Sequence, residues 1–133
     1  MNAEDVPVEL RLNVEKYARE AAGKLGLPAP TIAWHEAAPD DASWYAWASC
    51  QADIGQTNIR YLENVIHIKV PDCAALALED VRTVVYHECR HLWQIITGTF
   101  TGPDIREKDA DEWVITETGY VSRILHKTWN FNI

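Results

Sequence analysis

The stretch from Leu78 to Thr97 most constrains how this chain can fold, because its apolar residues recur at the spacing of an α-helix. The apolar residues that repeat at this spacing are Val81, Val84, Val85, Leu92, Ile95 and Ile96. Gly98 follows directly and is a suitable C-cap. The same helix contains an HExxH motif, from His87 to His91. We therefore expect one long helix that contributes both to the core and to the chemistry of the protein.

The HExxH spacing is typical of a zinc site on a helix. His87 and His91 are four residues apart and project from the same helical face, so two imidazoles can bind one ion. Glu88 flanks that ion without competing for it and can take a proton from a bound water molecule. A catalytic zinc ion usually has three protein ligands and one water ligand. The motif therefore predicts a third ligand elsewhere in the chain.

Glu107 and Asp111 are the candidates for the third ligand, because they too are four residues apart on an expected helix, residues 104–127. The connection formed by residues 97–103 can span roughly 20 Å when extended, which allows the second helix to fold back beside the first. Two other interpretations stay open. Asp104 and Glu107 can form a capping box, and the acids can simply belong to a solvated helix face.

The combined pattern resembles that of the gluzincin metallopeptidases, in which HExxH is followed by a helix bearing ExxxD, often as ExxAD. The matching residues are His87, Glu88, His91, Glu107, Ala110 and Asp111. The resemblance implies that Glu107 is the third ligand, that Asp111 orients a ligand histidine and that Ala110 allows close helix packing. The order of elements is also similar to that of minimal gluzincin domains, including the ImmA/IrrE-type peptidases. This likeness is specific only from Val65 to Val114.

The remaining patterns predict an α+β fold. An amphipathic helix is expected from Val8 to Leu25, ended by Gly26 and Pro28. Expected strands are Thr31 to Glu36, Trp44 to Gln51, Ile59 to Leu62 and Val65 to Val70. The last two strands would form a hairpin around Glu63-Asn64, and Pro71 would end the second of them. Pro39 to Asp41 would form a turn. Gly119 can interrupt the last helix. We expect a single zincin-like domain over residues 1–133, with an N-terminal helix, a small and mainly antiparallel sheet, the metal-binding helix and a C-terminal helix carrying the glutamate.

Composition and charge exclude several classes of protein. The 133 residues include 20 acids and 12 bases, for a net charge of −8, which argues against a nucleic-acid partner. No apolar run is long enough to cross a bilayer and no secretory signal is visible, so we expect a cytoplasmic protein with no membrane partner. Cys50, Cys73 and Cys89 lack a CxxC spacing and are expected to be reduced thiols.

These features predict a zinc-dependent peptidase. Zn²⁺ held by His87, His91 and Glu107 would lower the pKa of its water molecule to near neutrality. Glu88 would deprotonate that water for attack on a peptide carbonyl and then pass the proton to the leaving amine.

Further residues are candidates for binding the substrate. Tyr120 or Tyr86 could stabilise the developing oxyanion. A peptide or protein substrate would pair as an added strand with a sheet edge formed by residues 65–70. Trp44 and Trp47 could line a cleft.

Two other functions remain open: a binding or regulatory module with a structural zinc ion, and a helical interaction domain without metal. The oligomeric state stays open as well. Cys89 is expected to point away from the metal, and His35, His67 and His126 are expected to be ordinary strand or helix residues.

Overall fold

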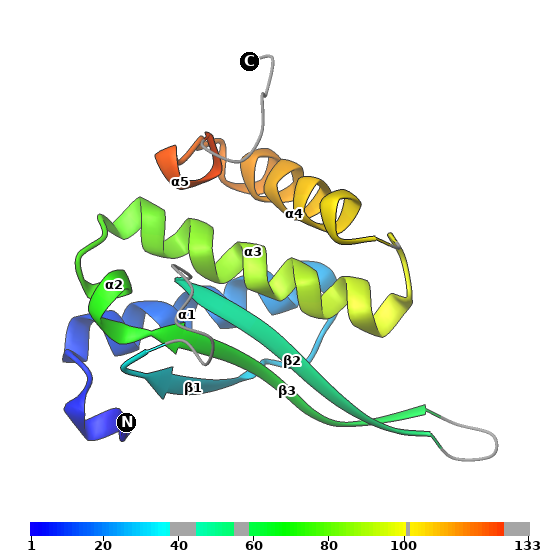
Figure 1. The fold of residues 1–133 in the computed structure, drawn as a ribbon, viewed down its shortest axis with the longest axis horizontal. Helices are drawn as coiled ribbons and strands as arrows, with labels where there is room; N and C mark the ends of the chain where they lie inside the picture. Colours follow the sequence, from blue (N-terminus) through cyan, green and yellow to red (C-terminus); the bar gives the residue numbers. More distant parts are fainter. Residues whose placement is uncertain (38–44, 55–58, 101, 127–133) are drawn as a thin grey trace.

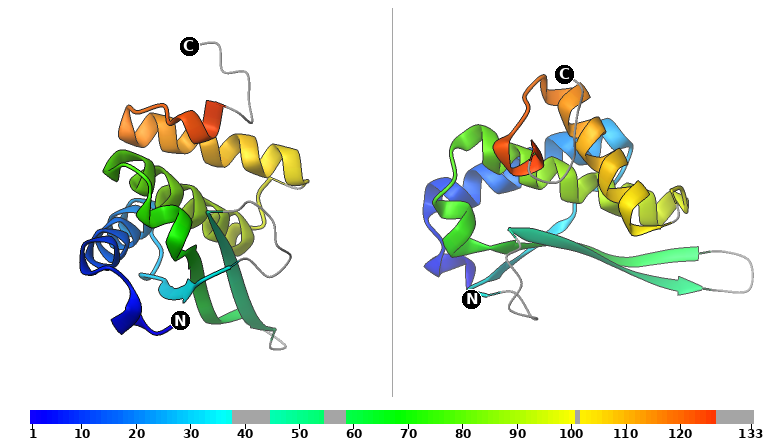
Figure 2. Two further views of the ribbon diagram at one scale, coloured as in Figure 1. Left: turned by 60° about the vertical axis from the view of Figure 1, so that its left-hand side comes forward. Right: turned by 45° about the horizontal axis from the view of Figure 1, so that its top comes forward.

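The computed structural model describes residues 1–37, 45–54, 59–100 and 102–126; for residues 51–54, 59–63 and 126 it describes the backbone only. The elements lie in layers (Figure 1). A three-stranded sheet forms one layer, α1 and α3 lie side by side over one of its faces, and α4 and α5 cover the opposite side of α3 (Figures 1 and 2). Helices and strands of this kind make an α+β fold, as the sequence predicts.

Two long helices form the centre of the molecule. They are α1 (Val8–Leu25) and α3 (Leu78–Thr97), and both have the predicted bounds. Each is followed by a glycine in the left-handed region, Gly26 with φ 71° and Gly98 with φ 67°. Residues with a Cβ atom rarely adopt this conformation, so the two glycines determine where the helices end.

The shorter helices differ in part from the prediction. They are η1 (Ala3–Asp5), α2 (Val70–Ala74), α4 (Pro103–Thr118) and α5 (Arg123–His126). The helical segment predicted over residues 104–127 is divided into two helices at Gly119, where the sequence allows a break. Gly119 caps α4 with a φ of 67°, and α5 begins only at Arg123. A left-handed residue cannot continue the α-helical hydrogen-bond pattern, so the interruption expected at Gly119 ends the helix.

The sheet has the strand order β1-β3-β2, which leaves β3 in the centre. The strands are β1 (Thr31–His35), β2 (Ala46–Ile54) and β3 (Ile59–Lys69). β3 pairs in parallel with β1 and antiparallel with β2, so the sheet is mixed where a mainly antiparallel one was expected. The expected turn at residues 39–41, and Trp44, lie outside the described residues.

The hairpin predicted around Glu63-Asn64 is wrong. Both residues lie inside β3, where Glu63 pairs with Gln51 and Asn64 pairs with Cys50. Residues with low strand propensity are accepted here because β2 runs alongside and pairs with nearly the whole length of β3. The pairing has one irregularity, a β-bulge between Gln51 and Ala52. The paired strands extend beyond the end of α3 (Figures 1 and 2).

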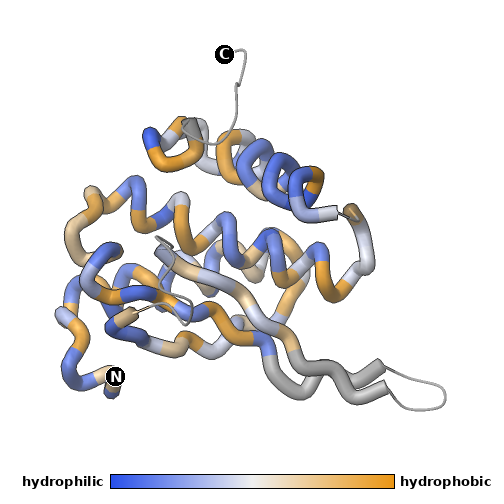
Figure 3. Tube along the Cα trace, in the orientation of Figure 1, coloured by the Kyte–Doolittle hydropathy of each residue, from blue (hydrophilic) through white to orange (hydrophobic). Residues whose placement is uncertain are grey.

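The core lies between the sheet and the two long helices. Ile66 and Ile68 of β3 are fully buried and belong to one apolar cluster with Val14 of α1 and Val85 of α3. Polar and apolar residues alternate along α3 (Figure 3), since its other face meets α4 and the site described below. None of the helices in the described part of the chain combines the length and apolarity that crossing a bilayer requires.

Because Ile66 is fully buried, Ile66→Ala should lower the free energy of unfolding by about 2 to 5 kcal/mol, through lost burial and the cavity it leaves. Leu12→Ala, at a position that is 54% exposed, should change it by less than about 0.5 kcal/mol. Urea denaturation monitored by circular dichroism measures both values. Equal effects of the two substitutions would contradict the core described above.

Candidate metal centre

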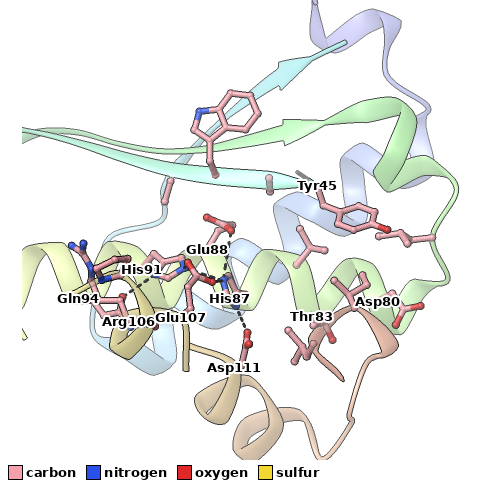
Figure 4. Close-up of a pocket in the computed structure, with 18 of the residues that line it drawn as sticks. Tyr45, Asp80, Thr83, His87, Glu88, His91, Gln94, Arg106, Glu107 and Asp111 are labelled. Carbon is pink, nitrogen blue, oxygen red and sulfur yellow. Dashed lines mark hydrogen bonds and ion pairs between the residues drawn. The ribbon is translucent and has the colours of Figure 1, made fainter. Parts of the chain in front are cut away.

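Three potential metal ligands converge from two helices. His87 and His91 of α3 have their Nε2 atoms 2.9 Å apart. The Glu107 carboxylate of α4 reaches both rings, with Oε2 3.0 Å from His87 Nε2 and Oε1 2.9 Å from His91 Nε2. Figure 4 shows the three side chains pointing toward one another. Among the described residues, this is the group of His, Cys, Asp and Glu side chains whose ligand atoms could hold a metal ion.

The second nitrogen of each ring has its own partner. His87 Nδ1 lies 2.6 Å from Asp111 Oδ1, and both atoms are buried with no other partner among the described residues. His91 Nδ1 lies 2.8 Å from Gln94 Oε1. A carboxylate and an amide oxygen can only accept, so each Nδ1 carries the proton and each Nε2 presents a lone pair in the neutral ring.

This donor set fits a divalent cation. Two nitrogen lone pairs and a carboxylate within 3.0 Å repel one another unless positive charge lies among them. A tetrahedral zinc ion, with bonds of about 2.0 Å, separates its ligand atoms by about 3.3 Å. The three atoms therefore need to move apart by only a few tenths of an ångström. Two imidazoles and one carboxylate are a ligand combination that zinc accepts.

The capping interpretation of Glu107 is wrong. α4 begins at Pro103, with Gly102 at the N-cap position and no side-chain cap hydrogen bond. Asp104 therefore lies inside the first turn and is not the cap residue. The Glu107 carboxylate faces the two histidines and not the end of its own helix. Asp111 also turns inward, since only 1% of it is exposed, so the pair is not a solvated face.

Glu88 lies beside the ligands without being one of them. Its Oε1 is 4.0 Å from His87 Nε2, and the side chain is 7% exposed. Figure 4 shows Glu88 reaching from α3 toward the strands, whereas Asp111 approaches His87 from the opposite side. Burial raises the pKa of Glu88 to about 7, although the neighbouring imidazoles oppose this shift. A carboxyl group in this environment can exchange protons near neutral pH.

The ligands are electrostatically coupled. Burial by itself lowers the pKa of His87, but the carboxylates of Asp111 and Glu107 outweigh it and raise that pKa to about 10. The pKa of His91 is also raised, since its contacts with Glu107 outweigh burial. Burial opposes ionisation of Glu107, yet the two imidazoles hold its pKa well below the ordinary value. Protonation of the two rings and ionisation of Glu107 therefore favour each other.

The three ligands face an open cleft with a volume of about 1020 Å³. One wall is the edge strand β2 with the residue before it, from Tyr45 to Ala48. The other walls come from α3, α4 and α5. Their apolar contributions include Leu76, Val84, Ile95, Ile124 and Leu125. An extended ligand can therefore reach the metal ligands and the backbone of β2 together.

Tyr120 and Tyr86 are not brought to the ligands. The Tyr120 hydroxyl donates to Asp80 Oδ1 at 3.0 Å, and Tyr120 does not line the cleft. Tyr86 is buried, and its hydroxyl donates to Glu20 at 3.1 Å and accepts from Arg82. Any part played by either hydroxyl in stabilising an oxyanion remains a prediction.

Cys89 and Arg90, the other two residues between the motif histidines, point away from the three potential ligands. Cys89 is buried against α1, with its thiol 3.9 Å from the carbonyl oxygen of Ala18, and burial raises the pKa of that thiol. Arg90 forms a bidentate ion pair with Asp109 of α4, at 2.8 and 3.1 Å. Its guanidinium lies 3.8 Å from the ring centroid of Trp93. Both residues thus contact neighbouring helices.

A second histidine pair occurs on the sheet. His35 Nε2 lies 2.8 Å from His67 Nδ1, and Ser49 Oγ lies 2.8 Å from His67 Nε2. Trp47 stacks on His67 with a centroid distance of 4.9 Å. Neighbouring strands bring these residues together, so the spacing along the sequence gives no sign of the contact. The described residues offer no third ligand for a metal ion at this pair.

Gln94 is the residue of the centre that the sequence patterns do not reveal. It lies three positions after His91, on the same helical face, and is 2% exposed. The signal that the sequence offers for Gln94 is its position, one turn after the motif on the same helical face. A glutamine buried at such a position needs hydrogen-bond partners, which the motif and the neighbouring helix can supply.

Comparison of the chain with protein-family models, with curated proteins and with solved structures finds no match.

The purified protein should bind about one equivalent of Zn²⁺, and Glu107→Gln should weaken that binding by about a hundredfold or more. The reason is that losing partners that only orient a ligand already costs about 10- to 100-fold. Glu112→Gln, on the exposed face of the same helix, should bind as the wild type does. Competition with a chromophoric chelator measures each affinity. Equal affinities for the two variants would remove Glu107 from the centre.

Proposed function

We propose that this protein is a zinc-dependent peptidase that uses His87, His91 and Glu107 as metal ligands and Glu88 as general base. The observation that carries the proposal is the convergence of these four side chains at the wall of a cleft next to an edge strand. The pattern of residues resembles that of the gluzincin metallopeptidases, which supports the same function. The order of elements is also similar to that of minimal gluzincin domains, including those of the ImmA/IrrE type.

A catalytic role for the metal is favoured over a structural one. A structural zinc ion normally has four protein ligands, whereas a catalytic ion keeps one position for water. The described residues supply a group of three ligands, and that group faces a cleft. When bound, zinc would supply Lewis acidity and acidify a water molecule at its open position.

Glu88 is placed to move the protons of the reaction. It can accept a proton from a water molecule beside the ligands as the water oxygen attacks the peptide carbonyl carbon. The C–N bond then breaks, and the same carboxyl group donates that proton to the leaving nitrogen. Its burial on the strand side of α3 limits its contact with bulk water.

The substrate strand predicted along residues 65–70 needs correction. β3 has strand partners on both sides, so it offers no free backbone edge there. β2 is an edge strand, and residues 46–48 line the cleft. We propose that a peptide in extended conformation pairs with β2, because backbone hydrogen bonds to an edge strand would hold its scissile bond over the metal ligands.

Glu88→Gln should retain zinc but lose peptide cleavage by about 100-fold or more, because an amide cannot accept the proton of the attacking water. Glu79→Gln, in the exposed first turn of the same helix, is the matched control and should retain activity. The assay is cleavage of a peptide library by the zinc-loaded protein, with zinc content measured on the same samples.

Wild-type activity in Glu88→Gln would exclude the mechanism. Cleavage by neither the wild type nor the control, with zinc fully bound, would favour the alternative of a binding module with a structural ion.

A further inference from the structure

We infer that Gln94 is a positioning residue for the zinc site, which fixes the tautomer and orientation of His91 and is itself held by Asp109 of α4. The inference rests on the proposed zinc site and goes beyond it, since neither the sequence pattern nor the resemblance assigns Gln94 any part. The evidence is a continuous chain of hydrogen bonds from α4 to the His91 ring.

The three contacts of Gln94 admit one orientation of its amide. Its nitrogen lies 2.9 Å from the carbonyl oxygen of Arg106 and 2.8 Å from Asp109 Oδ2. Both partners are acceptors, so the NH₂ group must face them and the amide oxygen must face His91 Nδ1. Rotating the amide by half a turn would place its oxygen against the carbonyl oxygen of Arg106 and against Asp109 Oδ2, where no hydrogen bond can form. Nδ1 of His91 therefore carries the proton, and Nε2 keeps its lone pair for the metal.

Asp109 is fixed in turn by Arg90. The guanidinium donates two hydrogen bonds to the Asp109 carboxylate, and it lies over the Trp93 ring. The two hydrogen bonds from Arg90 hold the Asp109 carboxylate in place, with Oδ2 also available as an acceptor for Gln94. Arg90, Asp109 and Gln94 form a relay that we call the His91 relay.

The His91 relay mirrors the contact on the other ligand. His87 is oriented by Asp111, a residue of α4 that contacts the ring directly. His91 is oriented by Gln94, a residue of α3 that is held by α4. Glu107 lies between Arg106 and Asp109 along α4. The same helix therefore supplies the third ligand and fixes the orientation of both other ligands.

Gln94→Met keeps the length of the side chain but removes its hydrogen bonds. We expect zinc affinity to fall about 10- to 100-fold, as is usual when a partner that orients a metal-bound histidine is lost. We also expect the Nδ1 proton signal of His91 in the zinc-loaded protein to disappear from NMR spectra through exchange with water. Thr97→Val is the matched control. It removes a hydrogen bond of 2.7 Å on the same helix that does not reach a ligand.

A conservative pair of variants separates orientation from packing. Gln94→Glu can still accept from His91 Nδ1 but sets a carboxylate against Asp109, so zinc affinity should fall. Adding Asp109→Ala removes the opposing carboxylate and leaves the Arg90 guanidinium to neutralise the new one, so it should recover at least tenfold of the loss. Packing alone predicts no loss in Gln94→Met and no such recovery. If Gln94→Met does not fold, the comparison of Gln94→Glu with the double variant decides the question.

Wild-type zinc affinity together with an unchanged His91 ring proton in Gln94→Met would overturn the inference. Failure of the double variant to regain affinity would overturn the part assigned to Asp109. Both measurements concern metal binding and the imidazole proton, so they stand apart from peptide cleavage. A protein whose zinc affinity depends on the His91 relay but which cleaves no peptide would disprove the proposed function alone.

Discussion

Partners on α3 and α4 hold both imidazole rings of the candidate centre in one orientation. Asp111 and Gln94 contact the two Nδ1 atoms, and both Nε2 atoms lie about 3 Å from the Glu107 carboxylate. Two imidazole nitrogens and a carboxylate this close together are stable only when protons or a metal ion lie among them. The two helices therefore hold together three groups that could bind a metal ion.

α4 is held against α3 by polar contacts as well as by apolar packing. Ala110 is fully buried, which allows the two backbones to come near each other. The ion pair of Arg90 with Asp109 and the contact of His87 with Asp111 lie on either side of Glu107 in the sequence. A partly buried ion pair adds little net stability, but it selects one relative position of its partners. The contacts that fix α4 thus also direct the Glu107 carboxylate toward the two histidines.

The sequence predicts local features well and pairing between distant segments poorly. The bounds of α1 and α3 follow from apolar periodicity and from Gly26 and Gly98, all of which act within one helix. The hairpin at Glu63-Asn64 and the free edge at residues 65–70 were wrong because strand pairing depends on residues far away in the chain. Ligand spacing along two helices indicated His87, His91 and Glu107, whereas Gln94 owes its contacts to α4 and carries no motif of its own.

The burial of Cys89 links the chemistry of the motif to the interior of the protein. Its side chain occupies the space between α3 and α1, one residue from Glu88 and two from each histidine of the motif. Interiors are packed as tightly as organic crystals, so a bulkier residue there would push α3 away from α1. The imidazole rings of His87 and His91 would then move together with α3. The HExxH pattern allows any residue at position 89. In this chain, however, the packing of α3 against α1 limits the size of that residue.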